Sequence, residues 1–254
     1  MRNGFVAITA ATLALMGTTP ATAASKILIV DADFTGSTVK AAFDATGLFS
    51  TVDYLDLGFS GVLTSSDLAG YDGAYVYTNY PPVHPGDWGD ALKSFVDAGG
   101  QLTLSTYAFS SPWDIPGGIT GAGYAPFLNS GINGDVSGTI TPVAPDKVFN
   151  GVNLAGVTYF HNGNYAQPTL AAGAVLVATD SGTGLIAHNA AGSVYGFNLY
   201  AGFGASSDTY LMIANSLTGQ ISSAPEPSSW AMMLAGFGLV GGALRRRKTA
   251  VSFA

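Results

Sequence analysis

The chain has 254 residues, a formal net charge of −7 and no cysteine, which excludes a disulfide framework, a thiolate nucleophile and a sulfur-based zinc site. Between the two chain ends, four lysines stand against fifteen aspartates, so this central region has a formal charge of −11. Nucleic-acid binding requires lysine and arginine to neutralise phosphates, and the sequence therefore argues against a nucleic-acid partner.

The first 24 residues predict a secretory signal peptide. Arg2 supplies the positive start, Phe5–Met16 supplies the apolar stretch, and Ala21 and Ala23 form a small-residue cleavage site. We expect signal peptidase to cut after Ala23 or Ala24, so that the rest of the chain is exported.

Residues 25–221 predict one α/β domain with a sizeable core. Its first half alternates apolar runs with helix-period segments, and Ser37 is a candidate cap for the first helix. The expected strands are 26–31, 52–57, 72–78 and 101–105, the expected helices are 37–46 and 85–97, and 63–68 is a short turn or helix. This order predicts a doubly wound, mostly parallel sheet with right-handed crossovers.

The second half of the domain is less regular. Residues 110–134 are rich in glycine, proline and aromatic residues and predict a long excursion over the sheet. The expected elements that follow are strands at 135–141, 175–179, 185–188 and 192–199, turns at 146–152 and 180–184, and a closing helix at 207–217. In that helix Tyr210, Ile213, Ala214 and Leu217 are expected to face the core.

Several segments resemble the flavodoxin-like, class I glutamine-amidotransferase-like fold, as in ThuA-like proteins and domains beside galactosidases. The matching segments read KILIVDAD, LAGYDGAYVYTN, FVDAGGQLTLS, DKVFNGV and VLVATDSGTGLIAHNAAGSVYGFNLY. Enzymes of that family carry a nucleophilic cysteine on the turn after the strand that matches 101–104. Here the turn reads Ser105-Thr106-Tyr107, so the resemblance implies the fold and excludes amidotransferase activity.

The carboxyl ends of parallel strands are where ligands bind in such sheets. We therefore predict a candidate ligand cleft there, with aromatic residues and His161 on its rim, suited to sugars. The candidate residues are Asp31, Asp33, Thr78, Asn79, Tyr80, Ser105, Thr106, Trp113, Tyr124, His161 and Asn162. The alternative is the ordinary polarity of strand ends.

Chemistry at the same place is a second possibility. Asp31-Ala-Asp33-Phe-Thr35 spells the DxDxT signature of haloacid-dehalogenase-like phosphatases, in which the first aspartate is the nucleophile, the second the acid/base, and magnesium is bound. The acidic pair that the metal also requires is missing at its usual spacing. Asp31, Asp33 and Asp180 clustered around a cation-sized gap would favour a hydrolase, whereas scattered ones would favour binding.

Other catalytic patterns are missing from the sequence. There is no GxSxG and no P-loop, and the three histidines lack the spacing of metal ligands. We expect no metal, no cofactor and no catalytic residue.

The last stretch, residues 222–254, predicts a membrane anchor. A Pro225-Glu226-Pro227 turn precedes an uncharged apolar run at 228–244, and the basic tail 245–248 follows directly. As a helix the run would be roughly 26 Å long, close to the thickness of a bilayer's hydrocarbon core. Basic residues stay on the cytoplasmic side, so we expect the bulk of the chain outside the inner membrane.

This stretch resembles the PEP-CTERM protein-sorting signal in its PEPxxWA subtype. The residues that carry the resemblance are Pro225, Glu226, Pro227, Trp230, Ala231, Arg245, Arg246 and Arg247. It implies a transient anchor that the membrane protease-transpeptidase exosortase recognises and removes, in a Gram-negative bacterium that makes exopolysaccharide. The alternative is an ordinary C-terminal anchor.

The sequence thus predicts an exported protein of the cell surface or extracellular matrix, anchored in the inner membrane as a precursor. Its α/β domain is expected to be non-catalytic, with a binding or structural role towards exopolysaccharide. The competing prediction is an extracytoplasmic hydrolase of sugars or phosphate esters that uses the strand-end aspartates.

Overall fold

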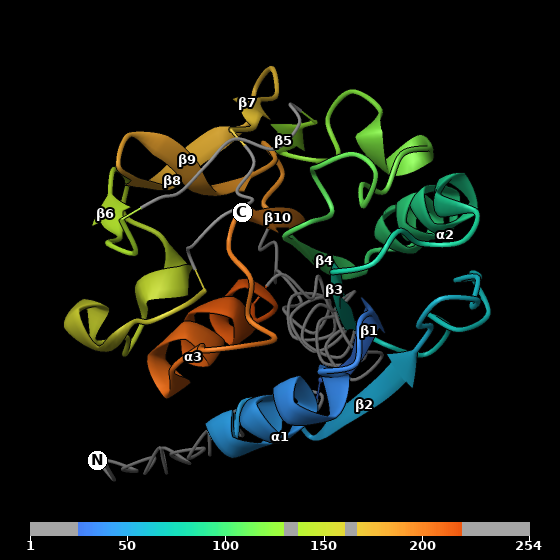
Figure 1. Cartoon of the computed structure of the whole chain (residues 1–254), viewed down its shortest axis with the longest axis horizontal. Coiled ribbons are helices and arrows are strands. Elements are labelled where there is room, and N and C mark those ends of the chain that lie inside the picture. Colours follow the sequence, from blue (N-terminus) through green and yellow to red (C-terminus); the bar gives the residue numbers. More distant parts are fainter. Residues whose placement is uncertain (1–24, 130–136, 161–166, 220–254) are drawn as a thin grey trace, which may run out of the picture.

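The computed structural model describes residues 25–129, 137–160 and 167–219, which form a mixed α/β domain around one large sheet (Figure 1). The strands of this sheet lie in the order β2-β1-β3-β4-β10-β9-β8-β6. Five neighbouring strands are parallel: β2 (Thr51–Asp56), β1 (Lys26–Ala32), β3 (Gly73–Thr78), β4 (Gln101–Ser105) and β10 (Val194–Phe197). The predicted mostly parallel sheet is therefore confirmed.

The remaining strands pair antiparallel. β10 is followed across the sheet by β9 (Thr183–His188), β8 (Val175–Asp180) and the short β6 (Thr141–Pro142). A separate small sheet joins β5 (Phe127–Leu128) to β7 (Thr169–Leu170). The late antiparallel strands thus extend the parallel part of the sheet beyond β10.

Helices cover both faces of the sheet (Figure 1): α1 (Gly36–Thr46) and α3 (Ser207–Ser216) lie on one side, and α2 (Pro85–Asp97) lies on the other. Alternation along β1 explains the two layers, because successive side chains of a strand point to opposite faces. Ile27 and Ile29 pack with the α1 and α3 cluster, whereas Leu28 and Val30 pack with the α2 cluster.

The helix ends show which local signals the sequence carries. The predicted bounds of α2 are confirmed, with Pro85 in its first turn. For α1 the cap prediction was wrong, because Ser37 lies inside the helix. The residue at the N-cap is Thr35, and its side chain makes no capping hydrogen bond. Instead the carboxylate of Asp31 accepts a hydrogen bond from the Gly36 amide at 3.0 Å, so a strand residue caps the helix.

Residues 57–72 connect β2 to β3 through turns, which is one of the two options predicted for 63–68. Two further details differ from expectation. The expected strand at 192–199 is limited to β10. Of the expected strand at 135–141, the described part pairs only at Thr141–Pro142, and residues 135–136 lie outside the described residues. All four side chains expected on the inner face of the closing helix are buried.

Both predicted targeting segments, 1–24 and 222–254, lie outside the described residues, and so does the predicted span 228–244. Across the three described ranges, none of the helices combines the length and apolarity needed to cross a bilayer.

Candidate functional site

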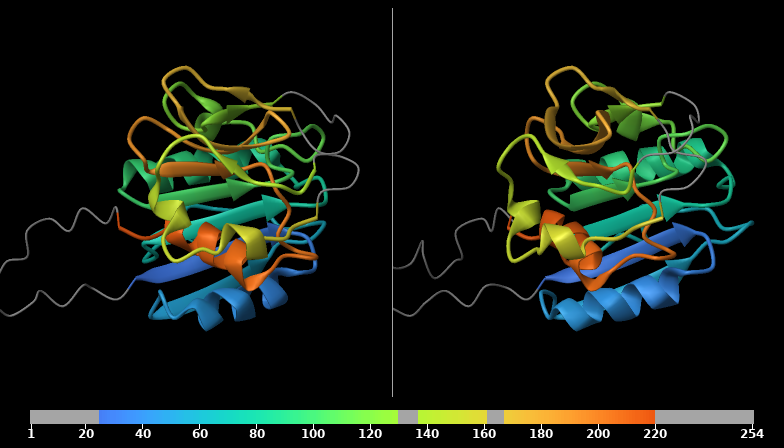
Figure 2. Two further views of the ribbon diagram at one scale, coloured as in Figure 1. Left: turned by 90° about the vertical axis from the view of Figure 1, so that its left-hand side faces the viewer. Right: turned by 60° about the vertical axis from the view of Figure 1, so that its left-hand side comes forward.

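Two aspartates, Asp31 and Asp33, lie where β1 ends, and both are buried. Asp31 is the penultimate residue of the strand and Asp33 follows it, with exposed fractions of 0% and 3%. The arrowheads of β1, β3 and β4 lie at this same edge (Figure 2). Burial of two carboxyl groups is costly unless donors satisfy them, so their partners define the site.

Asp31 is held by one oxygen only. Its Oδ2 accepts hydrogen bonds from the Gly36 amide at 3.0 Å, the Tyr77 hydroxyl at 3.2 Å and, more weakly, the Tyr54 hydroxyl at 3.4 Å. Its Oδ1 is buried without a hydrogen-bond partner.

Desolvation is the main influence on the pKa of Asp31. Burial raises the pKa of Asp31 from 3.8 to about 7, although the Tyr54 and Tyr77 hydroxyls oppose the shift; the negative charges of Asp56 and Asp33 add to it. Burial and the charge of Asp31 likewise raise the pKa of Tyr77 far above its ordinary value, so that hydroxyl remains a donor. Near neutral pH, Asp31 is therefore divided between its protonated and ionised forms.

Asp33, by contrast, has donors on both oxygens. Its Oδ1 accepts from the Phe34 amide at 2.7 Å and, at 3.4 Å, from the Asn79 side-chain amide. Its Oδ2 accepts from the Thr35 hydroxyl at 2.8 Å and from the Tyr200 hydroxyl. The Thr35 and Tyr77 hydroxyls lie 3.0 Å apart and join the two aspartates into one network.

Of the predicted cleft residues, the structure brings Asp31, Asp33 and Asn79 together. Three other members bond elsewhere: Thr78 donates to the Trp113 carbonyl at 2.8 Å, Ser105 to the Leu199 carbonyl at 2.5 Å, and Thr106 to the Asn198 side chain at 3.2 Å. These hydroxyls tie loops to the strand ends. Of the predicted aromatic rim, Tyr124 donates to Asp97 at the end of α2, and the Trp113 ring packs against Tyr107. His161 and Asn162 lie outside the described residues.

Asp180, the third aspartate of the hydrolase hypothesis, belongs to a different cluster. Its carboxylate accepts from the backbone amides of Ser137 and Gly138 and from the hydroxyls of Ser137, Ser181 and Tyr159. Burial alone would raise the pKa of Asp180, but these donors prevail and lower it. None of its partners is a partner of Asp31 or Asp33. Among the described residues no three acidic or histidine side chains are grouped to hold a metal ion.

Sequence reasoning missed the tyrosines that complete the network. Tyr77 lies on β3, where alternation directs its side chain to the same face as Tyr75, and this signal was available. Tyr200 follows β10 and reaches Asp33 only because that strand returns beside β4. No local pattern indicates that contact.

Sequence reasoning also missed an exposed group of aromatic rings at this edge. Phe34 and Phe59 are 58% and 59% exposed, and their ring centroids lie 5.2 Å apart. Tyr80, which the sequence did place at a strand end, lies 5.4 Å from Phe34 and 4.5 Å from Phe59.

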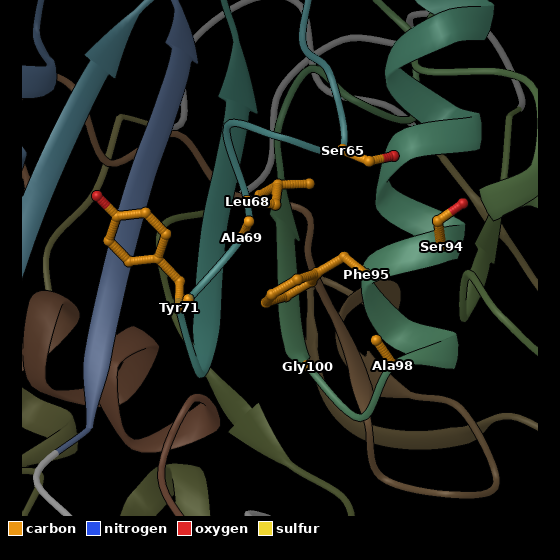
Figure 3. Close-up of a pocket in the computed structure, with 9 residues that line it drawn as sticks. Ser65, Leu68, Ala69, Tyr71, Ser94, Phe95, Ala98 and Gly100 are labelled. Carbon is orange, nitrogen blue, oxygen red and sulfur yellow. The ribbon is translucent and has the colours of Figure 1, made fainter.

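A shallow cavity of about 380 Å³ lies away from this network, beside the starts of β3 and β4 (Figure 3). It opens between the 57–72 connection and α2, and Leu68 and Phe95 face each other across it. Its lining is mainly apolar and holds none of the predicted site residues.

Fold and site together define an α/β domain with a buried carboxylate–tyrosine network at the carboxyl edge of its sheet. Residues 223–248 match the PEP-CTERM protein-sorting motif. The chain is thus an exported protein with exosortase as its processing partner. No curated protein sequence matches the chain.

Solved structures resemble the chain in fold. A protein assigned as a GMP synthase subunit, from Thermoplasma acidophilum, shares 12% identity at a TM-score of 0.51, covering 84% of this chain and 98% of its own. A cytoplasmic protein of Salmonella typhimurium shares 14% identity at a TM-score of 0.50, covering 76% and 98%. A ThuA-like protein from Bacteroides uniformis shares 13% identity at a TM-score of 0.46, covering 78% and 92%. At these identities the likeness concerns the fold alone.

Proposed function

We propose that the α/β domain is a non-catalytic binding or structural domain that acts at the cell surface or in the extracellular matrix, in association with exopolysaccharide. The observation that supports this is the state of the strand-end aspartates. Asp33 has donors on both oxygens, and Asp31 is fully buried and caps α1. These carboxylates stabilise the strand exit and leave little freedom for a nucleophile or an acid/base.

The route to that location follows from the predicted segments. In this proposal signal peptidase removes 1–24, the span 228–244 anchors the precursor in the inner membrane, and exosortase then cuts near Pro225-Glu226-Pro227. Replacing these three residues by alanine should leave full precursor in the membrane fraction. If that variant reached the medium or cell surface as wild type does, the sorting step would be wrong.

The binding role has a direct test. On a column of exopolysaccharide prepared from the host, the purified full-length chain should be retained. Albumin, an unrelated acidic protein, should pass through the same column. Equal passage of both proteins would contradict the exopolysaccharide association.

A second candidate is the extracytoplasmic hydrolase, and one observation favours it. Asp31 has an unpartnered Oδ1 and a pKa of about 7, which suits a general acid or base. If this candidate were correct, Asp31→Asn and Asp33→Asn would abolish hydrolysis of aryl glycosides or aryl phosphates. Under the binding proposal, wild type and both variants have the same background activity.

A further inference from the structure

Three aromatic side chains form a cluster on the surface beside the exit of β1, the aromatic trio (Phe34, Phe59 and Tyr80). The planes of their rings are inclined to one another by 59° to 64°, so each ring packs at a steep angle against the other two. Such inclined contacts are favourable between aromatic rings. The trio therefore keeps a fixed arrangement although more than half of each phenylalanine remains in water.

The backbone below the trio is fixed by the exit of β1. The Phe34 amide donates to the Asp33 carboxylate at 2.7 Å, and the Tyr80 amide donates to the Ala32 carbonyl at 2.9 Å. The loop that carries Phe59 begins where the Leu57 amide donates to the Asp31 carbonyl at 3.0 Å. Three connections far apart in sequence are thus anchored on consecutive residues of one strand exit.

An anchored cluster of this kind has a low ordering cost on binding, because the rings are already in place. Exposed rings gain free energy when a ligand covers them, at about 25 cal/mol per Å² of apolar surface removed from water. Sugar rings present flat C–H faces that stack on aromatic rings, and their hydroxyls remain free for polar partners. Resting on the proposed exopolysaccharide association, we propose that the aromatic trio is the stacking site for sugar rings of an uncharged polysaccharide.

Charge is the reason for an uncharged polymer. Each lysine of the domain is engaged away from the trio: Lys40 pairs with Asp44, Lys93 with Asp97, and Lys147 donates to the Thr218 carbonyl. Lys26 lies at the start of β1, at the opposite edge of the sheet. Asp56 is exposed at the end of β2, three positions before Phe59, so an anionic polymer would meet like charge beside the trio.

The same charge argues against a second copy of the chain as the occupant. Two domains of formal charge −11 would repel each other on approach. A stable protein interface also uses about 20–30 residues on each side, far more than three rings.

Affinity electrophoresis of the purified full-length chain tests the proposal. The gels contain hydroxyethyl cellulose, dextran or galactomannan as uncharged polymers, or polygalacturonate as the anionic one. We expect retardation by at least one uncharged polymer and none by polygalacturonate. The Phe34→Ala/Phe59→Ala variant should bind about tenfold or more weakly, which corresponds to about 1.4 kcal/mol.

Two variants separate stacking from other effects. Phe203→Ala removes a phenylalanine that is 69% exposed and contacts Phe160 instead of the trio, and it should keep its affinity within about twofold of wild type. Phe59→Leu keeps apolar bulk without a ring face, so it should fold normally, as urea unfolding can show, and still bind more weakly.

Each contrary result overturns one named part of the proposal. Retention unchanged in the double variant, or equally reduced in Phe203→Ala, overturns the assignment to the trio but leaves the proposed function standing. Equal retention by polygalacturonate overturns the uncharged class. If the wild type is retained by none of the four polymers, the stacking site is overturned, while retention on the host's own exopolysaccharide decides the proposed function separately. Self-association that the double variant abolishes would assign the trio to a second copy.

Discussion

The hydroxyl of Tyr200 donates a hydrogen bond to the carboxylate of Asp33, which lies 167 positions earlier in the chain. The bond joins the exit of β10 to the exit of β1, although β3 and β4 separate these two strands in the sheet. It links the segment after β10 to the Asp33 network and supplies one of the four donors to the buried Asp33 carboxylate. The Tyr200 ring also stacks near Tyr107, with 6.2 Å between centroids, which fixes its approach.

Removing the Tyr200 hydroxyl should therefore destabilise the domain. Tyr200→Phe leaves a buried carboxylate short of a donor, and we expect the free energy of unfolding to fall by about 1–3 kcal/mol. Urea unfolding of the full-length chain measures this difference.

The matched control is Tyr124→Phe, because Tyr124 also donates to an aspartate, Asp97, but at the exposed surface. Its loss should change stability by no more than about 0.5 kcal/mol. Equal losses of stability in the two variants would show that the buried hydrogen bond to Asp33 stabilises the domain no more than the exposed one to Asp97.

Close packing over the network predicts a second effect. A Cβ atom added at Gly202 would lie 2.4 Å from both the Thr35 Oγ1 and the Tyr200 hydroxyl. Neither atom can yield without breaking its bond to Asp33. We expect Gly202→Ala to destabilise the domain by about 1–3 kcal/mol, as overpacking commonly does.

Gly86→Ala provides the comparison for this measurement. Gly86 lies in the first turn of α2 with open space around its would-be Cβ, so alanine should stabilise the helix by about 0.5–1 kcal/mol. Thermal unfolding of the two variants should shift in opposite directions. If Gly202→Ala were as stable as wild type, the packing around Gly202 would have to be looser than the 2.4 Å distances indicate.

How far the sequence could predict this domain depends on how local each signal is. The apolar run of β1 and the Pro85 start of α2 are local patterns, and both elements form where predicted. Parallel strands end at one edge, so Asp31, Asp33 and Asn79 could be placed together without coordinates.

Contacts between remote segments could not be predicted in this way. Tyr200 reaches Asp33 only after β10 has paired with β4, and the loop that carries Phe59 has no periodicity that would reveal its direction. At 63–68, where the sequence left a turn or a helix open, a turn forms, and the Asp67 carboxylate accepts from both the amide and the hydroxyl of Thr64.

The protonation of Asp31 predicts a dependence of stability on pH. In the folded chain its pKa is about 7, whereas in the unfolded chain it returns to 3.8. Between these values the folded state holds a proton that the unfolded state has lost. Stability is therefore greatest below pH 4 as far as this group is concerned, and it falls as the pH rises through about 7.

Asp31→Asn tests this, because asparagine can still accept from the Gly36 amide but never ionises. The shift of about three pH units bounds the effect at roughly 4 kcal/mol. Urea unfolding at pH 5 and pH 8.5 should show wild type losing stability at the higher pH. The variant should lose clearly less and be the more stable of the two at pH 8.5.

The charges and hydroxyls around Asp31 sharpen the same experiment. Asp56 raises the pKa of Asp31, so Asp56→Asn should move the fall in stability to lower pH. Tyr77→Phe removes a donor that lowers it, so that variant should move the fall to higher pH. If wild type and Asp31→Asn showed the same pH dependence, Asp31 would be ionised throughout this range, and another group would have to explain how two carboxylates are tolerated at the exit of β1.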